Sequence, residues 1–245
     1  MFCYGLPGAG KTVMAATVID HLQRNYLSSA TENSDKTGVA YLYYDHQACE
    51  HQKPETMLAS IAKQFLARQM LFGAPLPTSI KNFYQKHRCS SSSSLSLPII
   101  SELVQSSLSF FETVYIVVDA LDEGRSVKKL LAELQHIQAG SRAVHMFFTS
   151  RRESSITEAI EDLFPRHMSL GIAAQDGDME RYIDENIAGS TLLGRRSRML
   201  SPEDKHRFIS QAKSAIIRAA NGMYVLFSRY TEVNCLLTIR ELAFC

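Results

Sequence analysis

The sequence lacks a net charge, a paired cysteine motif and a long apolar run. Its 26 lysines and arginines balance 25 aspartates and glutamates, so the formal net charge is only +1 and no overall field would gather nucleic acid or anionic lipid. The five cysteines contain no Cys-x-x-Cys pair, which disfavours zinc or dithiol chemistry and indicates reduced thiols. No stretch approaches the roughly 18 apolar residues of a membrane span, and no signal-like segment opens the chain. We therefore expect a cytoplasmic protein that binds neither nucleic acid nor membranes.

Strand-like and helix-like segments alternate over the first two thirds of the chain, which has 245 residues, of which 45% are hydrophobic. After residue 12 the apolar residues Met14, Val18, Leu22 and Tyr26 recur at steps of four, with Ala15 and Ile19 beside them. They predict a helix with one apolar face. Further helices are expected over residues 54–72, 79–86, 98–111 and 127–137, and strands over residues 39–44, 114–118, 144–148 and 167–172. This alternation predicts an α/β fold, a parallel sheet with helices on both faces.

The pattern becomes purely helical near residue 173. Helical spacing is present over residues 178–187 and 201–219. We therefore expect an α/β core over residues 1–172 and an incomplete helical extension over residues 173–245. Residues 1–4 can supply only a short stub of the first strand, so we expect the chain to be a fragment of a longer protein.

A complete phosphate-loop pattern lies at residues 5–12, Gly-Leu-Pro-Gly-Ala-Gly-Lys-Thr, between the strand stub and the first helix. Its glycines let backbone N–H groups face phosphate oxygens, and the helix that follows presents its positive end. Lys11 is expected to reach the terminal phosphates, and Thr12 to offer its hydroxyl to Mg²⁺. The alternative is a glycine-rich turn with an incidental lysine. The residues expected to bind nucleotide are Gly5, Pro7, Gly8, Ala9, Gly10, Lys11 and Thr12.

Acidic residues follow the apolar strand predicted over residues 114–118. This strand delivers Asp119 to the carboxyl edge of the sheet, where ligands of open α/β sheets bind, and Asp119 is expected to hold Mg²⁺. Asp122 and Glu123 lie in the turn beyond and could orient the attacking water or accept its proton. The sequence leaves open which of the two does so, and a third reading is that both only cap the next helix.

The strand predicted over residues 144–148 runs into Thr-Ser-Arg. The guanidinium of Arg151 offers a fixed fork of N–H donors that suits phosphate oxygens. Arg151 is therefore a candidate sensor whose contact would form with a triphosphate and be lost with a diphosphate. The alternative is that Arg151 and Arg152 form an exposed pair that closes a loop.

Three motifs in this order, Gly-Leu-Pro-Gly-Ala-Gly-Lys-Thr, Val-Val-Asp-Ala-Leu-Asp-Glu and Phe-Thr-Ser-Arg, resemble those of the NACHT family of signal-transducing P-loop ATPases, which belongs to the STAND class. More narrowly, they resemble the NACHT segment of fungal ankyrin-repeat and nephrocystin-like proteins. The resemblance covers residues 1–172 and implies a five-stranded parallel sheet in the order 5-1-4-3-2. It implies phosphate and Mg²⁺ contacts for Lys11 and Thr12, Mg²⁺ for Asp119, water for Asp122 or Glu123, and the terminal phosphate for Arg151.

The resemblance also implies a function. It favours an ATP-binding, slowly hydrolysing, Mg²⁺-dependent switch with a closed ADP state and an ATP state that forms homo-oligomers, within a full-length protein that has effector and repeat domains. No Asn-Lys-x-Asp motif is present to read guanine, so the resemblance favours adenine. One alternative is a small-molecule kinase in which the basic residues 194–198 cover the transferred phosphate, and it would require a phosphate acceptor. Another is a truncated scaffold that does not hydrolyse nucleotide.

Overall fold

The structure, a computed structural model, describes residues 1–27, 36–48, 50–87, 96–140 and 143–173, together with isolated positions between 177 and 214. The chain divides into two compact units, the first formed by Met1–Tyr4 and Lys11–Leu170 and the second by Gly5–Gly10 and Gly171–Cys245. The helices expected beyond residue 173 and the basic residues 194–198 lie outside the continuous described segments. The domain boundary near residue 173 stays a prediction.

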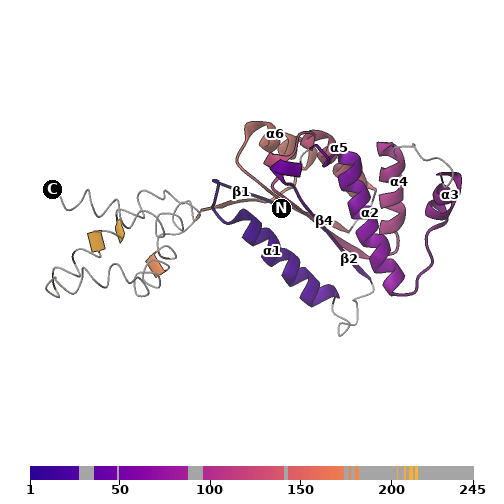
Figure 1. Cartoon of the computed structure of the whole chain (residues 1–245), viewed down its shortest axis with the longest axis horizontal. Helices are drawn as coiled ribbons and strands as arrows, with labels where there is room; N and C mark the ends of the chain where they lie inside the picture. Colours follow the sequence, from indigo (N-terminus) through magenta and orange to yellow (C-terminus); the bar gives the residue numbers. More distant parts are fainter. Residues whose placement is uncertain are drawn as a thin grey trace. The chain divides into compact units, whose positions relative to one another are not determined.

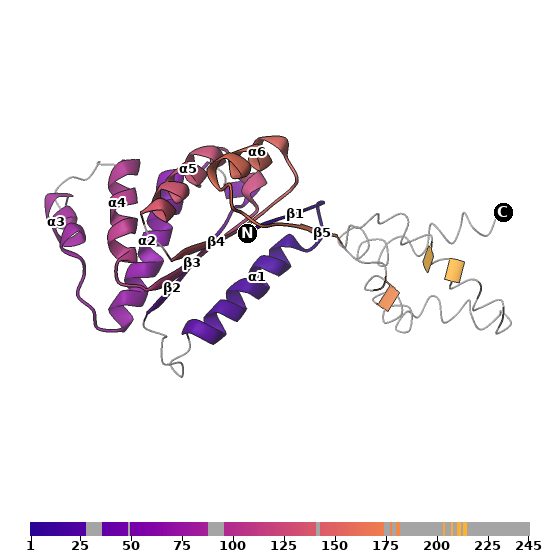
Figure 2. The same cartoon turned by 180° about the vertical axis from the view of Figure 1, so that it is seen from behind.

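Five strands form one parallel sheet in the order β2-β3-β4-β1-β5 (Figures 1 and 2). β2 pairs with β3, β3 with β4, and β4 with β1, all in parallel. This confirms the predicted order, since 5-1-4-3-2 is the same order read from the other edge. The strands are β1 (Phe2–Gly5), β2 (Thr37–Tyr43), β3 (Thr113–Asp119), β4 (Val144–Ser150) and β5 (Ser169–Ile172).

The predicted helices up to residue 140 are present close to their expected bounds, and one helix was not predicted. The missed helix, α6, buries Ile156, Ala159 and Ile160 on one face, so its helical spacing was present in the sequence and was overlooked. No helix among the described segments is long and apolar enough to cross a bilayer. The helices are α1 (Lys11–Leu22), α2 (Pro54–Leu71), α3 (Thr78–His87), α4 (Leu97–Leu108), α5 (Val127–Ala139) and α6 (Ser154–Leu163), with short turns η1 (Gln23–Leu27), η2 (His46–Ala48) and η3 (Leu121–Glu123).

Helices cover both faces of the sheet, with α1 on one face and α2, α4, α5 and α6 on the other (Figures 1 and 2). Successive strand residues alternate between the two cores, so Ile116 faces the larger core and Val117 the smaller one. The predicted apolar face of α1 is confirmed except at Met14, and Val18 and Tyr26 pack partly buried against the smaller core. Ala15, Ile19 and Leu22 are buried, whereas Met14 is 36% exposed. The sheet side chains beneath the helix determine its rotation about its axis, and small Ala15 allows a close approach.

The outer edge of β2 is covered by side-chain amides. Gln64 of α2 accepts a hydrogen bond from the backbone N–H of Tyr41 at 3.0 Å and donates one to the Tyr41 carbonyl at 2.9 Å. Gln52 donates in the same way to the carbonyl of Tyr43 at 2.9 Å. These amides satisfy backbone groups that would otherwise be open to another strand.

Candidate functional site

Several predicted residues reach one edge of the sheet because its strands are parallel. Asp119 is the last residue of β3, and Ser150 is the last residue of β4. Tyr43, the last residue of β2, stands opposite Asp119 in the strand register. The carboxyl edge therefore collects side chains that lie far apart in the sequence, as expected for an open α/β sheet.

The glycine loop that precedes α1 has the backbone that its sequence predicts. Gly8 has a φ of 74° and Gly10 a φ of 91°, in the left-handed region that favours glycine. A Cβ atom on Gly5 would lie 2.4 Å from the carbonyl oxygen of Ile172, so only glycine fits there. The backbone N–H of Ala9 closes a turn on the carbonyl of Leu6 at 3.2 Å. The loop residues Gly5–Gly10 belong to the second compact unit.

Lys11 is the first residue of α1 and lies in the electrostatic field of the other predicted residues. Burial lowers the pKa of its ammonium, and the carboxylate of Asp122 opposes this by raising the pKa. The Arg151 guanidinium lowers the Lys11 pKa further, and Asp119 raises it. The lysine, both aspartates and the arginine that were predicted from separate segments therefore form one cluster of charges.

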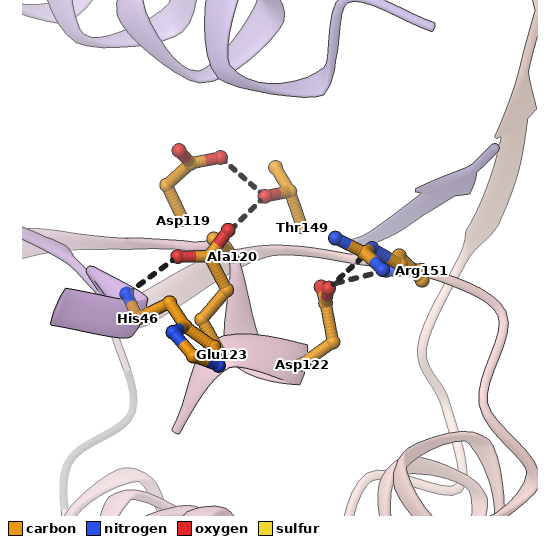
Figure 3. A network of polar contacts seen from close by, with 7 residues as sticks. All are labelled: His46, Asp119, Ala120, Asp122, Glu123, Thr149 and Arg151. Atoms are coloured by element: carbon orange, nitrogen blue, oxygen red, sulfur yellow. Dashed lines mark hydrogen bonds and ion pairs between the residues drawn. The ribbon is translucent and has the colours of Figure 1, made fainter. Parts of the chain in front are cut away.

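Asp119 is 3% exposed and is oriented by Thr149, which lies in the neighbouring strand. The Thr149 hydroxyl donates a hydrogen bond to Oδ1 of Asp119 and accepts one from the backbone N–H of Ala120 at 2.9 Å (Figure 3). A buried carboxylate needs such a partner, because burial without a hydrogen bond is costly. No role at the site was predicted for Thr149. Only the strand register indicates this role, because the pairing of Val118 with Phe148 brings the residues that follow them, Asp119 and Thr149, together.

Ala120 turns the chain sharply after β3. Its φ of 57° and ψ of 51° are left-handed, and it is the only non-glycine residue with a positive φ among the described segments. Such a conformation in an alanine costs free energy and persists only where the surroundings require it. The turn starts η3, in which Leu121 is fully buried and the two residues that follow it, Asp122 and Glu123, are acidic. It therefore sets where Asp122 and Glu123 can reach.

Asp122 forms an ion pair with Arg151. Its Oδ1 accepts the backbone N–H of Arg151 at 2.8 Å, and its Oδ2 lies 3.0 Å from Nε of the same residue. The Asp122 side chain is 5% exposed and that of Arg151 is 52% exposed. Arg152 lies apart from this pair, with its guanidinium carbon 5.1 Å from the centroid of the Tyr4 ring. Both arginines are exposed, as the alternative expects, but their side chains contact different residues; the sensor role of Arg151 stays a prediction.

Glu123 has a different partner. Its Oε2 accepts a hydrogen bond from the backbone N–H of His46 at 2.9 Å, at the start of η2 beyond β2 (Figure 3). The N-cap of α5 is Ser126. The reading of Asp122 and Glu123 as mere caps of the next helix is therefore wrong.

Two further side chains near Asp119 were not predicted. Burial raises the pKa of the Tyr43 phenol, and the Asp119 carboxylate adds to that rise. Burial also raises the pKa of the Cys3 thiol in β1, although the Lys11 ammonium opposes the change. Tyr43 is 39% exposed, whereas Cys3 is fully buried. Neither carries a recognisable motif, and only the fold brings them to Asp119.

These features define the class of P-loop nucleoside triphosphatases. They are a parallel sheet with this strand order, a phosphate-loop sequence after its first strand, and an acid and an arginine at the ends of β3 and β4. Residues 1–151 match the family described as Nephrocystin 3, N-terminal, and the chain belongs to that family. The match includes the loop, Asp119, Asp122, Glu123 and Arg151. No curated protein matches the chain.

Three solved structures illustrate what the chain is similar to. It has 18% identity and a TM-score of 0.48 to the Aeropyrum pernix ORC1 protein in complex with DNA, covering 75% of this chain and 42% of that one. For Drosophila ORC bound to DNA the identity is 10%, the TM-score 0.43 and the coverage 98% and 51%. For the Walker-type ATPase PABY2304 of Pyrococcus abyssi the values are 12%, 0.44, 99% and 69%. The chain thus spans 42% and 51% of the length of the first two.

Proposed function

We propose that this protein is an ATP-binding switch module of the NACHT type that hydrolyses ATP slowly with Mg²⁺. The observation that carries the proposal is the cluster of charges at the carboxyl edge of the sheet. The ammonium of Lys11, the carboxylates of Asp119 and Asp122 and the guanidinium of Arg151 interact there. In the sequence Lys11 directly follows the glycine turn, whose residue types suit phosphate binding through backbone N–H groups.

The residues fit a magnesium nucleotide. Mg²⁺ prefers oxygen donors and keeps several ligands from water and phosphate, so one carboxylate and one hydroxyl are enough protein ligands. Asp119 and Thr12 would supply them. Since the described part of the chain contains no group of three His, Cys, Asp or Glu side chains that could hold a metal, water and phosphate would supply the other ligands. When bound, the ion would neutralise phosphate charge.

Each residue of the cluster has a task in this proposal. Lys11 binds the terminal phosphates through its ammonium, and Thr149 keeps the Asp119 carboxylate in one orientation through its hydroxyl. Arg151 donates N–H groups to the terminal phosphate. Asp122 or Glu123 orients the attacking water or accepts its proton. Hydrolysis would remove the oxygen atoms that Arg151 contacts.

The switch follows from this difference between the two nucleotides. A ligand shifts a conformational equilibrium only by its difference in affinity for the two states. Arg151 can provide that difference because its contact requires the terminal phosphate. The resemblance to NACHT proteins favours adenine over guanine and a self-associating ATP state, in a longer protein with effector and repeat domains.

Substitution of Lys11 tests the proposal directly. We expect Lys11→Ala to weaken ATP binding on the order of 100-fold, because a partly desolvated cation that pairs with phosphate is removed. Calorimetric titration with ATP and Mg²⁺ measures the effect. The matched control is Lys128→Ala, which removes an exposed lysine of α5 outside the cluster. Equal ATP affinity in wild type and Lys11→Ala would sink the proposal.

A further inference from the structure

Asp122 and Glu123 are neighbours in sequence, but their carboxylates diverge. Asp122 reaches the end of β4 through Arg151, and Glu123 reaches the end of β2 through the backbone of His46 (Figure 3). β3 lies between these two strands in the sheet. The two carboxylates therefore contact residues that follow different neighbours of β3 in the sheet.

We infer that Asp122 is a positioning residue that holds Arg151 for the terminal phosphate, and that Glu123 is the residue that acts on the attacking water. The inference rests on the proposed function and removes an ambiguity that the sequence leaves open. Its basis is the pattern of hydrogen bonds at the two carboxylates.

Asp122 uses both of its carboxylate oxygens to hold one arginine. Each of its carboxylate oxygens accepts from Arg151, one from the backbone N–H and one from Nε, at 2.8 and 3.0 Å. Because the Asp122 side chain is only 5% exposed, water has little access to it. If Asp122 took a proton from water, it would break an ion pair that is partly desolvated. These contacts suit a residue that orients Arg151.

Arg151 is held in a way that leaves it able to bind an anion. A guanidinium has five N–H donors, and contact through Nε leaves those of the two terminal nitrogens for another acceptor. Arg151 follows Ser150, which pairs with Tyr4, the residue directly before the glycine loop. The strand register thus brings Arg151 out beside the strand that leads into the loop.

Glu123 is held less completely. One of its oxygens accepts a hydrogen bond from the His46 backbone N–H at 2.9 Å, and the carboxylate is half-buried. A single backbone hydrogen bond fixes the carboxylate while leaving acceptor positions on both oxygens. A fixed carboxylate with free acceptor positions meets the geometric requirement for a group that orients water.

The test compares the ratio of ATP to ADP affinity with the rate of hydrolysis in matched variants. Asp122→Asn keeps an acceptor for the Arg151 backbone N–H but loses the charge that holds Nε. We expect it to lower the affinity ratio about tenfold, as Arg151→Ala does, and the double variant to show no further fall. We expect Glu123→Gln to keep the ratio while kcat falls about 100-fold or more. Glu161→Gln, an exposed acid of α6, is the control and should change neither.

The outcomes separate this inference from the proposed function. An unchanged ratio in Asp122→Asn, effects of Asp122→Asn and Arg151→Ala that multiply in the double variant, or wild-type turnover in Glu123→Gln would each overturn the inference. If Asp122→Asn does not fold, Arg151→Lys takes its place, because it keeps the charge but cannot bridge Asp122 and phosphate; a wild-type ratio there would overturn the inference too. A wild-type chain that neither binds nor hydrolyses ATP contradicts the proposed function itself.

Discussion

Thr149 shows how a single hydroxyl can organise an acidic site. It is fully buried, donates to the Asp119 carboxylate and accepts from the backbone N–H of Ala120. The same hydroxyl therefore satisfies a buried carboxylate and holds a left-handed turn. Removal of the Thr149 hydroxyl would leave both the Asp119 carboxylate and the Ala120 backbone N–H without this hydrogen-bond partner.

We expect Thr149→Val to destabilise the protein by about 2 kcal/mol, because an almost isosteric change leaves two polar groups without their partner. Unfolding by urea measures the loss of stability. The matched control is Thr157→Val in α6, because the Thr157 hydroxyl is buried without a hydrogen bond. That variant should be close to wild type or more stable. Equal stability losses for the two variants would contradict the role given to Thr149.

At the scale of elements, β2 and α2 depend on each other through Gln64. The amide of Gln64 pairs with both backbone groups of Tyr41 on the outer edge of the sheet. A second amide, from Gln52, pairs with Tyr43. A helix that follows the edge strand in sequence thus also closes that edge, which limits pairing with a strand from another molecule.

We expect Gln64→Ala to lower the free energy of unfolding by about 1–2 kcal/mol and to promote association that depends on protein concentration, because the Tyr41 backbone groups lose their partner. Urea unfolding and light scattering over a range of concentrations measure the two effects. Lys63→Ala, at an exposed neighbouring position of the same helix, is the control. A monomeric Gln64→Ala protein of wild-type stability would rule out this role.

At the scale of the whole molecule, the proposed switch makes self-association depend on the nucleotide. The resemblance to NACHT proteins favours a closed ADP state and an oligomeric ATP state. The arrangement of the core and the helical extension would then respond to the contact that Arg151 makes with the terminal phosphate.

We expect the protein to have a larger mass with ATP and Mg²⁺ than with ADP and Mg²⁺, because only the triphosphate engages Arg151. Glu123→Gln should strengthen the difference by slowing hydrolysis. Size-exclusion chromatography with light scattering, with the nucleotide in the running buffer, measures the mass. Arg151→Ala is the control, since it should give the same mass with both nucleotides. Identical masses for the wild type in both nucleotides would count against the switch.

Local patterns predicted most of the fold. The glycine loop requires left-handed φ angles at Gly8 and Gly10, and it has them. The apolar run before Asp119 forms β3, and helical spacing gave α2, α4 and α5 close to their bounds. These features depend on neighbours in the chain, whose spacing is visible in the sequence.

The sequence alone determined the order of strands and helices along the chain up to β5, apart from α6, and the residue types that arrive at the carboxyl edge. Only the tertiary structure decided that Met14 stays exposed at the margin of the apolar face of α1, that Thr149 orients Asp119, and that Asp122 and Glu123 face different partners. The physical reason is that each of these depends on a strand register or a helix rotation. Packing between segments distant in the sequence fixes both, and a one-residue change in either would bring a different side chain to the same place.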